Sequence, residues 1–513
     1  MPGEAPVPGE APATLPWHSK ILFGIGAIGE HVYTGMFNAF IVIFYNQALG
    51  LPNTLIGTAV LVALVGDAIS DPAVGILSDR LRSPWGRRHP FLLAAPIPLA
   101  LSLWCIFNPP AMLLAEGVDG GLAQVWPLFA WLLLWTTLSR LFVTLYVIPH
   151  LALGGELVRS QHERSQLFSM NTIFGYATGT LFSFIAWSYF LNGETPGPDG
   201  VPVANHLQAA SYAPLSLFAA VLILVAISTC ALGTLARGRA LSQPPQAQVT
   251  MSLPLFFRKI LGTLANRNYL FLLIGFFFFM ISVGVSETLN VFVYTYFWEL
   301  GASEIRWLGL AGFPGILLGA ALAPPLMRRF DRRPVLLVAI AGMVLFAQLV
   351  VNARLLGLLP ANGADILLPL LMANAFGLAL TVGVAGVTIL SMIGDVIDEN
   401  ELATGLREEG LFYSARAFFA KLSSSAGHFL AGVMLDWYVR LPQEAVPGQL
   451  AEDVVFRLGL AAGPIMALSA TIALFFYARY RLSHARHAEI MTELRARAAR
   501  SRPEAPSDAL SAG

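Results

Sequence analysis

Residues 54–88 read TLIGTAVLVALVGDAISDPAVGILSDRLRSPWGRR. The stretch begins with an apolar run long enough to form a membrane-spanning helix, which takes about 20 residues. Asp67 and Asp71 lie inside this run, and a loop with four arginines follows at 80–88. Charged side chains within a membrane helix are costly and are functional candidates by default. The segment therefore predicts a membrane protein with a polar working site inside the bilayer.

The whole chain has the composition of a membrane protein. Of its 513 residues, 56% are hydrophobic and 12% are charged, against about 25% charged in an ordinary soluble domain. The formal net charge is zero, so no basic excess indicates a nucleic-acid partner. We predict an all-α membrane protein with twelve transmembrane helices, at residues 20–48, 54–78, 90–108, 125–152, 166–191, 213–236, 268–297, 303–325, 334–354, 366–394, 411–436 and 457–480.

The charge of the connections predicts the orientation. Arginines are concentrated in 78–90, 237–267, 327–334 and the C-terminal tail, whereas the loops at 109–124, 192–212 and 356–364 contain no lysine or arginine. Positively charged loops remain on the cytoplasmic side, so both termini are expected there. The N-terminal residues lack the apolar region of a cleaved signal peptide. We expect a multi-pass protein of the plasma (inner) membrane.

The longest cytoplasmic connection divides the chain into two similar halves. The basic loop at 78–90 is echoed at 327–334. Two pseudo-equivalent halves around a site at the membrane midplane are the plan of many secondary transporters. The predicted organisation is a disordered cytoplasmic N-tail at 1–17, six-helix bundles at 18–236 and 268–482, a central cytoplasmic loop at 237–267, and a cytoplasmic C-tail at 483–513.

Several motifs carry a family resemblance that covers about residues 20–480. One resembles the loop signature of the major facilitator superfamily, in which an acidic helix end can pair with arginines in one conformation only; its residues are Gly75, Asp79, Arg80, Gly86, Arg87 and Arg88. Other segments are similar to the glycoside–pentoside–hexuronide:cation symporter family: 66–72, Ile148-Pro149, Glu163-Arg164, 395–414 and Lys421. The resemblance implies the major facilitator fold, with two pseudo-symmetric six-helix bundles.

The two intramembrane aspartates predict a coupling site. Asp67 and Asp71 are four residues apart and share one helix face. Because they repel each other, one must be protonated or a cation must bind between them. Thr144 lies as deep in the fourth helix as Asp71 in the second, at 1.5 Å per residue. The resemblance implies a cation-binding set, which comprises Asp67, Ser70, Asp71 and Thr144.

Two basic residues are assigned to coupling. Lys421 is expected at the level of Asp67, where it could neutralise the acidic pair when the cation has left. Arg140 lies one turn before Thr144 on the same helix. A permanent salt bridge from either residue is the alternative. The family pattern has an asparagine at Ser70 and an acidic residue at Val147, so Na⁺ and H⁺ both remain candidates for the coupling ion.

The candidate substrate-binding residues depart from the family pattern. They are Glu30, His31, Asn38 and Thr172. Glu30 and His31 stand where the family binds sugar through other charged residues, and Thr172 and Leu151 replace a sugar-binding arginine and tryptophan. These positions could instead form only helix–helix hydrogen bonds.

The predicted function is secondary active transport, in which cation-coupled symport moves a small polar solute by alternating access. A sugar or glycoside is the leading candidate, and a lysolipid or other amphiphile is the alternative. A membrane-embedded transferase is a remote alternative, because the sequence shows no nucleophile–base or metal-ligand constellation. We expect no enzyme, no cofactor or metal apart from the coupling ion, and a monomer whose partners are the solute and the lipid bilayer.

Overall fold

The computed structural model describes residues 14–113, 125–158, 160–196, 200–241, 253–443 and 445–500. These residues are almost entirely helical, apart from a short antiparallel hairpin in which β1 (Glu194–Pro196) pairs with β2 (Pro202–Ala204). Most of the predicted disordered N-tail, at 1–13, and the end of the C-tail, at 501–513, lie outside the described residues.

The first half contains six long helical segments. They are α1 (Trp17–Ile43) continued by the π-helical turn η1 (Phe44–Ala48), α2 (Asn53–Arg80), α3 (His89–Ala94) with α4 (Pro96–Ile106), α5 (Val125–Glu156), α6 (Gln161–Ile185) continued by η3 (Ala186–Phe190), and α7 (Ala209–Ala240). Two short 3₁₀ turns, η2 (Ala111–Leu113) and η4 (Asn205–Leu207), lie in the connections.

The second half repeats this arrangement after the helix α8 (Leu253–Thr263). Its segments are α9 (Arg267–Phe292) with η5 (Val293–Phe297), α10 (Ala302–Arg329), α11 (Arg332–Leu355), α12 (Leu367–Thr404), α13 (Glu409–Val433) with η6 (Met434–Val439), and α14 (Glu452–Leu460) joined through η7 (Ala461–Ile465) to α15 (Met466–Tyr477). The chain ends in α16 (His484–Arg500). The acidic run at 395–399, read from the sequence as the start of a loop, is instead the last part of α12.

Twelve segments of the described chain thus correspond to the twelve predicted spans. Ten are apolar enough to cross a membrane by length and composition alone, and the two that are not are α6 and α13. Both lie between the halves, where α6 packs against α10 and α13 packs against α2. Their polar residues can therefore face the partner half instead of lipid, which explains their lower hydropathy.

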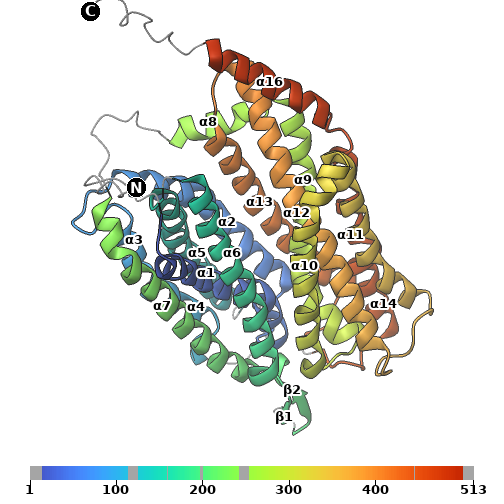
Figure 1. The fold of residues 1–513 in the computed structure, drawn as a ribbon. Helices are drawn as coiled ribbons and strands as arrows, with labels where there is room; N and C mark the ends of the chain where they lie inside the picture. The colour runs from blue at the N-terminus through green and yellow to red at the C-terminus, as the bar shows by residue number, and fades with distance from the viewer. Residues whose placement is uncertain are drawn as a thin grey trace, which may run out of the picture.

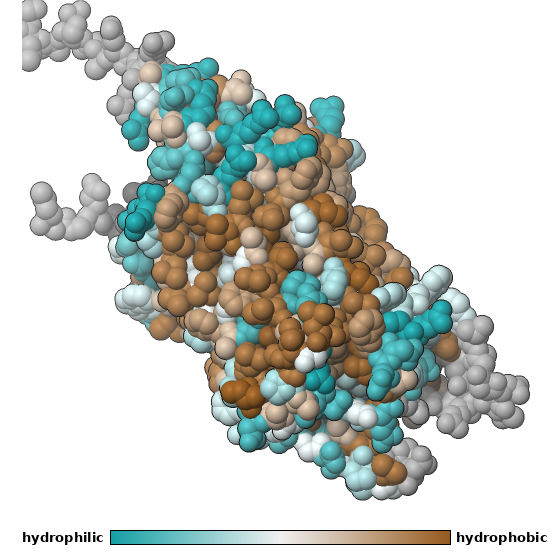
Figure 2. All heavy atoms as spheres, turned by 90° about the vertical axis from the view of Figure 1, so that its right-hand side faces the viewer, coloured by the Kyte–Doolittle hydropathy of each residue, from teal (hydrophilic) through white to brown (hydrophobic). Residues whose placement is uncertain are grey.

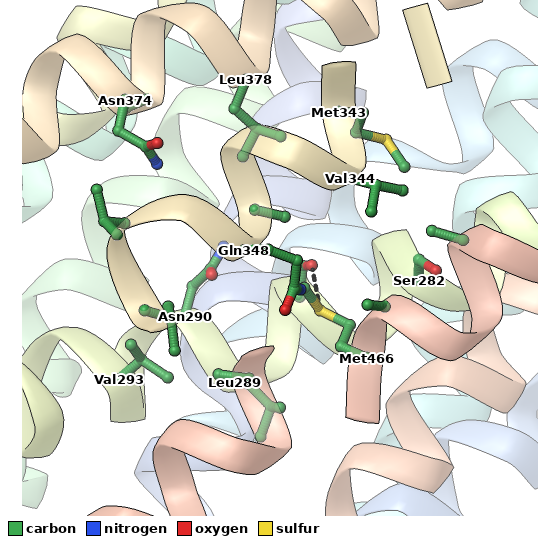
Figure 3. A pocket seen from close by; sticks show the side chains of 18 of the residues that line it. Ser282, Leu289, Asn290, Val293, Met343, Val344, Gln348, Asn374, Leu378 and Met466 are labelled. Atoms are coloured by element: carbon green, nitrogen blue, oxygen red, sulfur yellow. Dashed lines mark hydrogen bonds between the residues drawn. The ribbon is translucent and has the colours of Figure 1, made fainter. Parts of the chain in front are cut away.

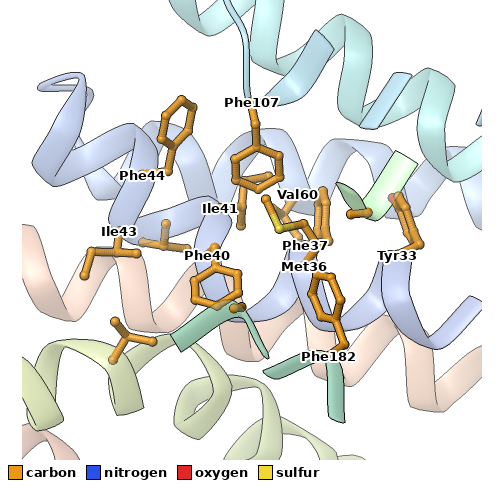
Figure 4. Close-up of a cluster of buried hydrophobic side chains, with 14 of the residues drawn as sticks. Tyr33, Met36, Phe37, Phe40, Ile41, Ile43, Phe44, Val60, Phe107 and Phe182 are labelled. Carbon is orange, nitrogen blue, oxygen red and sulfur yellow. The ribbon is translucent and has the colours of Figure 1, made fainter. Parts of the chain in front are cut away.

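The two halves lie side by side and present a common apolar belt (Figures 1 and 2). The belt separates two hydrophilic ends, as expected for a protein that spans a bilayer. Inside the first half, aromatic side chains of α1 and η1 pack against the end of α4 and against α6 (Figure 4). The rings of Phe44 and Phe107, for example, are 5.1 Å apart.

Close backbone contact holds α10 against α12. A Cβ atom at Gly319 would lie 2.1 Å from the carbonyl oxygen of Leu380, and one at Gly383 would lie 2.4 Å from that of Ile316. Such contacts require glycine, which lets membrane helices approach to backbone distance. These two helices are therefore packed closely together within the second half.

The halves are joined mainly at one end of the molecule. We call the end that carries α8, α16 and the arginine-rich loops the basic face, and the end that carries the β-hairpin and α14 the opposite face (Figure 1). Near the opposite face, Tyr296 donates a hydrogen bond to Gln47 across the halves at 2.9 Å. Nearer the basic face, α8 of the second half touches α2 of the first, while the ribbons of the two halves diverge toward this face (Figure 1).

Candidate functional site

The centre of the site is the acidic pair of α2. Asp67 and Asp71 lie one helical turn apart on the side of α2 that faces α5 and α13. The Asp67 side chain is 2% exposed and that of Asp71 is 24% exposed. One carboxylate is therefore sealed inside the protein, whereas the other is partly accessible to solvent.

Three side chains from two other helices meet these carboxylates. On α5, Arg140 Nη1 lies 3.3 Å from Asp67 Oδ2, and Thr144 Oγ1 donates a hydrogen bond of 2.7 Å to Asp71 Oδ1. On α13, Lys421 Nζ lies 2.5 Å from Asp71 Oδ2 and 3.7 Å from Asp67 Oδ2. We call these five residues the carboxylate cluster. Residues that the sequence placed at matching depth are thus in direct contact, and the contact spans both halves.

Two buried oxygens beside the cluster have no hydrogen-bond partner. They are Asp67 Oδ1 and Ser70 Oγ. An unsatisfied buried polar group costs about 1–3 kcal/mol, so it calls for an explanation. Together with Asp71 and Thr144, these oxygens form the kind of donor set that a hard cation prefers. A proton on a carboxylate would satisfy the same group.

Packing on α1 holds the guanidinium of the cluster in place. The Arg140 guanidinium carbon lies 5.3 Å from the centre of the Phe37 ring. One turn earlier on α1, the Tyr33 hydroxyl is 2.8 Å from Ser139 Oγ, next to Arg140 in sequence. The side chain is thus fixed between an aromatic face and Asp67, which gives the buried carboxylate a permanent counter-charge.

The predicted substrate residues are dispersed around this cluster. Glu30 of α1 interacts electrostatically with Lys421 and with His31. His31 Nδ1 lies 3.0 Å from the carbonyl oxygen of Ala27, and its ring packs on Gly175, where a Cβ atom would lie 2.4 Å away. Thr172 is exposed, and its hydroxyl donates to the backbone of its own helix. Glu30 therefore lies near enough to Lys421 for their charges to interact, although among the described residues no ion pair joins them and no hydrogen bond or ion pair joins Thr172 to the carboxylate cluster.

Sequence reasoning missed a second polar chain between the halves. Asn38 of α1, predicted to bind substrate, donates a hydrogen bond of 3.0 Å to Glu287 of α9. His428 Nε2 lies 3.4 Å from the same carboxylate, and its Nδ1 is 2.7 Å from Thr288 Oγ1. The signal was present, because His428 follows Lys421 by seven residues and so lies on the same face of α13.

The acidic and basic ends of the loop motif are paired within the first half. Arg88 bonds Asp79 and also lies 2.7 Å from Glu156 Oε1 at the end of α5. Arg87 lies 3.0 Å from the same Glu156 oxygen. The sequence identified the arginines and Asp79, but the carboxylate that ties α2 to α5 was not recognised. This network joins the basic-face ends of α2 and α5, two of the three helices that carry the carboxylate cluster.

Two other motif residues have a local structural role. Gly86 adopts a φ of +83°, and a Cβ atom there would lie 2.6 Å from the carbonyl oxygen of Gly238. Gly75 lies in α2, where an added Cβ would make only ordinary contact, 3.8 Å from Ile148. Arg80 is exposed at the end of α2. Only glycine thus fits position 86, which lets the motif loop pack on the end of α7.

An aspartate closes the opposite face. Asp436 Oδ1 accepts hydrogen bonds from the backbone and side-chain nitrogens of Asn53, at 3.1 and 2.8 Å. Its Oδ2 accepts from the backbone nitrogen and hydroxyl of Thr54, at 2.6 and 2.8 Å. We call these three residues the outer clamp. Four bonds from one carboxylate join the start of α2 to the end of α13.

A cavity of about 290 Å³ lies inside the second half. It is enclosed by α9, α11, α12 and α15, and most of its lining is aliphatic or methionine (Figure 3). Glu287, the residue that meets Asn38 of the first half, also lines the cavity. The cavity therefore adjoins the interface between the halves.

Comparison with known proteins gives one consistent result. The sequence model of the family described as "MFS/sugar transport protein" matches residues 22–484. An uncharacterised symporter of Synechocystis sp. is 26% identical over 94% of this chain and 97% of its own length. The isoprimeverose transporter of Lactiplantibacillus pentosus is 21% identical over 90% of this chain and 89% of its own. The lactose permease of Lactobacillus delbrueckii is 22% identical over 96% of this chain and 74% of its own.

Solved structures agree on the fold. A nucleoside transporter superposes with a TM-score of 0.60 at 12% identity, over 90% of this chain and 100% of its own. A D-xylose–proton symporter superposes with a TM-score of 0.57 at 14% identity, over 90% of this chain and 97% of its own. At these identities the likeness shows the fold alone.

Proposed function

The chain belongs to the MFS/sugar transport protein family, and on this basis we propose that it imports a sugar or glycoside by cation-coupled symport and alternating access. Membership of this family confirms the predicted resemblance to the glycoside–pentoside–hexuronide:cation symporters. The chain is accordingly a multi-pass secondary transporter with the major facilitator fold, and the prediction that it is not an enzyme is confirmed by the same relatives.

The observation that carries the coupling proposal is the contact of Lys421 with both aspartates. Lys421 belongs to the second half, whereas Asp67 and Asp71 belong to the first. A cation that binds the aspartates must displace this ammonium and thereby break a contact between the halves. Cation occupancy and the relative position of the halves are then energetically linked, which is the requirement for coupling.

We assign the cation to Asp67, Ser70, Asp71 and Thr144. The unpartnered oxygens of Asp67 and Ser70 support this assignment, as does the partial exposure of Asp71. The charge of Arg140 neutralises that of Asp67. Lys421 and the cation then compete for Asp71. Na⁺ and H⁺ both fit this donor set. One cation entering down 100 mV supplies about 2.3 kcal/mol, or a roughly 50-fold accumulation.

The substrate assignment follows the named relatives. The isoprimeverose transporter and the lactose permease carry sugars by their names, which favours a sugar over the lysolipid alternative. We propose that Glu30, His31 and Asn38 line the substrate route. The charge of Glu30 interacts with that of Lys421, and Asn38 donates a hydrogen bond to Glu287 of the second half. Thr172 is exposed on α6 and would meet substrate only along the route.

We further propose that the basic face is cytoplasmic and that the transporter acts as a monomer. The structure is then inward-facing. Four arginines lie toward the opposite face, namely Arg306, Arg354, Arg440 and Arg457. They are outnumbered by the arginines of the loops and tail on the basic face, which supports this orientation.

The decisive experiment is uphill uptake by purified protein in liposomes, with isoprimeverose, lactose and xylose as probes and an imposed Na⁺ or pH gradient. Asp67→Asn and Asp71→Asn should abolish accumulation but leave exchange of substrate across the membrane. Asp365→Asn, on an exposed loop of the opposite face, is the matched control and should transport normally. Unchanged accumulation in both aspartate variants would refute the coupling assignment.

A further inference from the structure

None of the residues that line the cavity of the second half is among the proposed cation-binding or substrate-binding residues. Its volume of about 290 Å³ is at the lower end of the range for small-molecule pockets, about 300–1,000 Å³. It lies within one half, between α9 and the helices α11, α12 and α15. Space of this size inside a closely packed bundle is unusual, because protein interiors contain few voids larger than a water molecule.

The lining matches an apolar group. Most of the wall is valine, leucine, alanine and methionine, with Met343 and Met466 on facing helices (Figure 3). Methionine side chains adapt to ligands of varied shape because they are unbranched and polarizable. A free sugar would bury hydroxyls against this wall without partners, and each such hydroxyl costs free energy. The body of the cavity therefore selects against a bare sugar.

Polar groups mark where a ligand would be held. The Asn374 Oδ1 atom is buried without a hydrogen-bond partner, and its amide points into the cavity in Figure 3. Asn290, also on the wall, is exposed, and its side chain makes no hydrogen bond with any described residue. The Gln348 amide, by contrast, already donates to the carbonyl oxygen of Gly463 at 2.9 Å. The cavity thus offers two amide side chains without hydrogen-bond partners among the described residues, in a wall that is mostly apolar.

Glu287 connects the cavity to the interface between the halves. Its carboxylate lines the cavity and accepts the hydrogen bond from Asn38 of the first half. The Glu287 side chain is 38% exposed, so this junction is not sealed. A molecule at the interface could therefore place one end in the cavity while its other end remains among polar groups.

We propose that this cavity is an aglycone subsite, which binds the apolar group of an alkyl or aryl glycoside while the sugar lies at the interface beside Glu287. This proposal rests on the proposed function, because it takes sugar transport as given and assigns a site to the apolar group attached to that sugar. The substrate class is then a glycoside with an apolar substituent instead of a free sugar. Asn290 and Asn374 orient the glycosidic and substituent oxygens.

A chain-length series tests this subsite. Thermal stabilisation of the purified full-length protein is measured with D-xylose, D-glucose and D-galactose, and with the methyl, butyl and hexyl glycosides of each. A ligand at concentration L stabilises the folded protein by RT ln(1 + L/Kd), so at one fixed concentration a tighter ligand gives the larger stabilisation. Each methylene that the cavity covers should raise the affinity about fourfold, from ~0.8 kcal/mol per methylene, until the cavity is filled.

Paired variants separate the cavity from non-specific partition. Ala375→Phe fills the cavity from α12, and Ala373→Phe places the same ring on the exposed side of that helix. Ala375→Phe should bind methyl glycosides normally, but its affinity should no longer rise with the length of the alkyl chain. Ala373→Phe should keep this rise in affinity. If Ala375→Phe does not fold, Ala347→Phe on α11 makes the same test.

The outcomes are distinct. A flat series in the unmodified protein, or a gain with chain length that survives in Ala375→Phe, would overturn the aglycone subsite and leave sugar transport standing. Failure of every sugar and glycoside to stabilise the protein would instead count against the proposed function itself. If lysolipids stabilise the protein and no sugar or glycoside does, both the aglycone subsite and the proposed sugar transport are wrong.

Discussion

Replacing Lys421 by glutamine is predicted to tighten cation binding while it abolishes coupled transport. Lys421 is one of three lysines in the chain, and its Nζ lies 2.5 Å from Asp71 and 3.7 Å from Asp67. With Arg140, the carboxylate cluster contains two negative and two positive charges, so the sum is zero. Without Lys421, one negative charge is left over. The cation then no longer competes with an ammonium for the same oxygens.

The size of the effect follows from the exposure of the pair. Removing one partner of a fully buried ion pair costs about 3–5 kcal/mol. The Lys421 side chain is 36% exposed and that of Asp71 is 24% exposed, so solvent screens part of this interaction. We therefore expect about 1–3 kcal/mol, which corresponds to a roughly 5–150-fold gain in cation affinity. Uphill uptake should be lost, because cation binding no longer breaks a contact between the halves.

The assay is a cation titration of purified protein, followed by melting temperature. Na⁺ is varied at alkaline pH, and pH is varied in the absence of Na⁺, so that both coupling ions are examined. Lys259→Gln is the control, because its ammonium lies 3.5 Å from Glu408 on an exposed surface of the second half. Unchanged or weaker cation affinity in Lys421→Gln would refute the competition on which the coupling proposal depends.

Three further predictions use other contacts of the site. Thr144→Val should weaken cation binding by about 1 kcal/mol, or roughly fivefold, because the hydrogen bond to Asp71 is lost; an unaltered titration would exclude this hydroxyl as a ligand. Asp436→Asn should weaken the outer clamp, whose bonds to a charged group are worth about 1.5–3 kcal/mol each, and should widen spin-label distances across the opposite face; an unchanged distance distribution would contradict this. Gly175→Ala should lower the melting temperature, since the new methyl group overlaps the His31 ring and overpacking costs about 1–3 kcal/mol; equal melting temperatures would show that the ring moves freely.

The parts of the site that could be predicted from sequence are those set by helix geometry alone. Spans follow from apolar length, and the depth of a residue follows from its count along a helix. This is why Asp71, Thr144 and Lys421 could be expected at one level before their contacts were known. The spans predicted at 166–191 and 411–436 correspond to α6 and α13, although these two helices lack the apolarity of the other ten.

The parts that could not be predicted depend on how helices rotate and tilt against each other. The contact of Glu287 with Asn38 and His428 depends on the relative rotation of three helices. The outer clamp joins residues nearly 400 positions apart. The cavity is created by side chains that are each ordinary core residues. No local sequence pattern distinguishes a leucine that packs in the core from one that lines a cavity.

The π-helical turns of the described chain have a meaning beyond local geometry. Four of the five end the first and fifth membrane segments of the first half, as η1 and η3, and the first and fifth segments of the second, as η5 and η6, while η7 lies within the sixth segment of the second half. Such turns account for well under 1% of residues in proteins, and all four lie toward the opposite face. A rare irregularity that recurs at matching places is the mark of tandem duplication of an ancestral six-helix unit. The two copies now differ in chemistry. The first carries Asp67 and Asp71, and the second carries Lys421, which pairs with them.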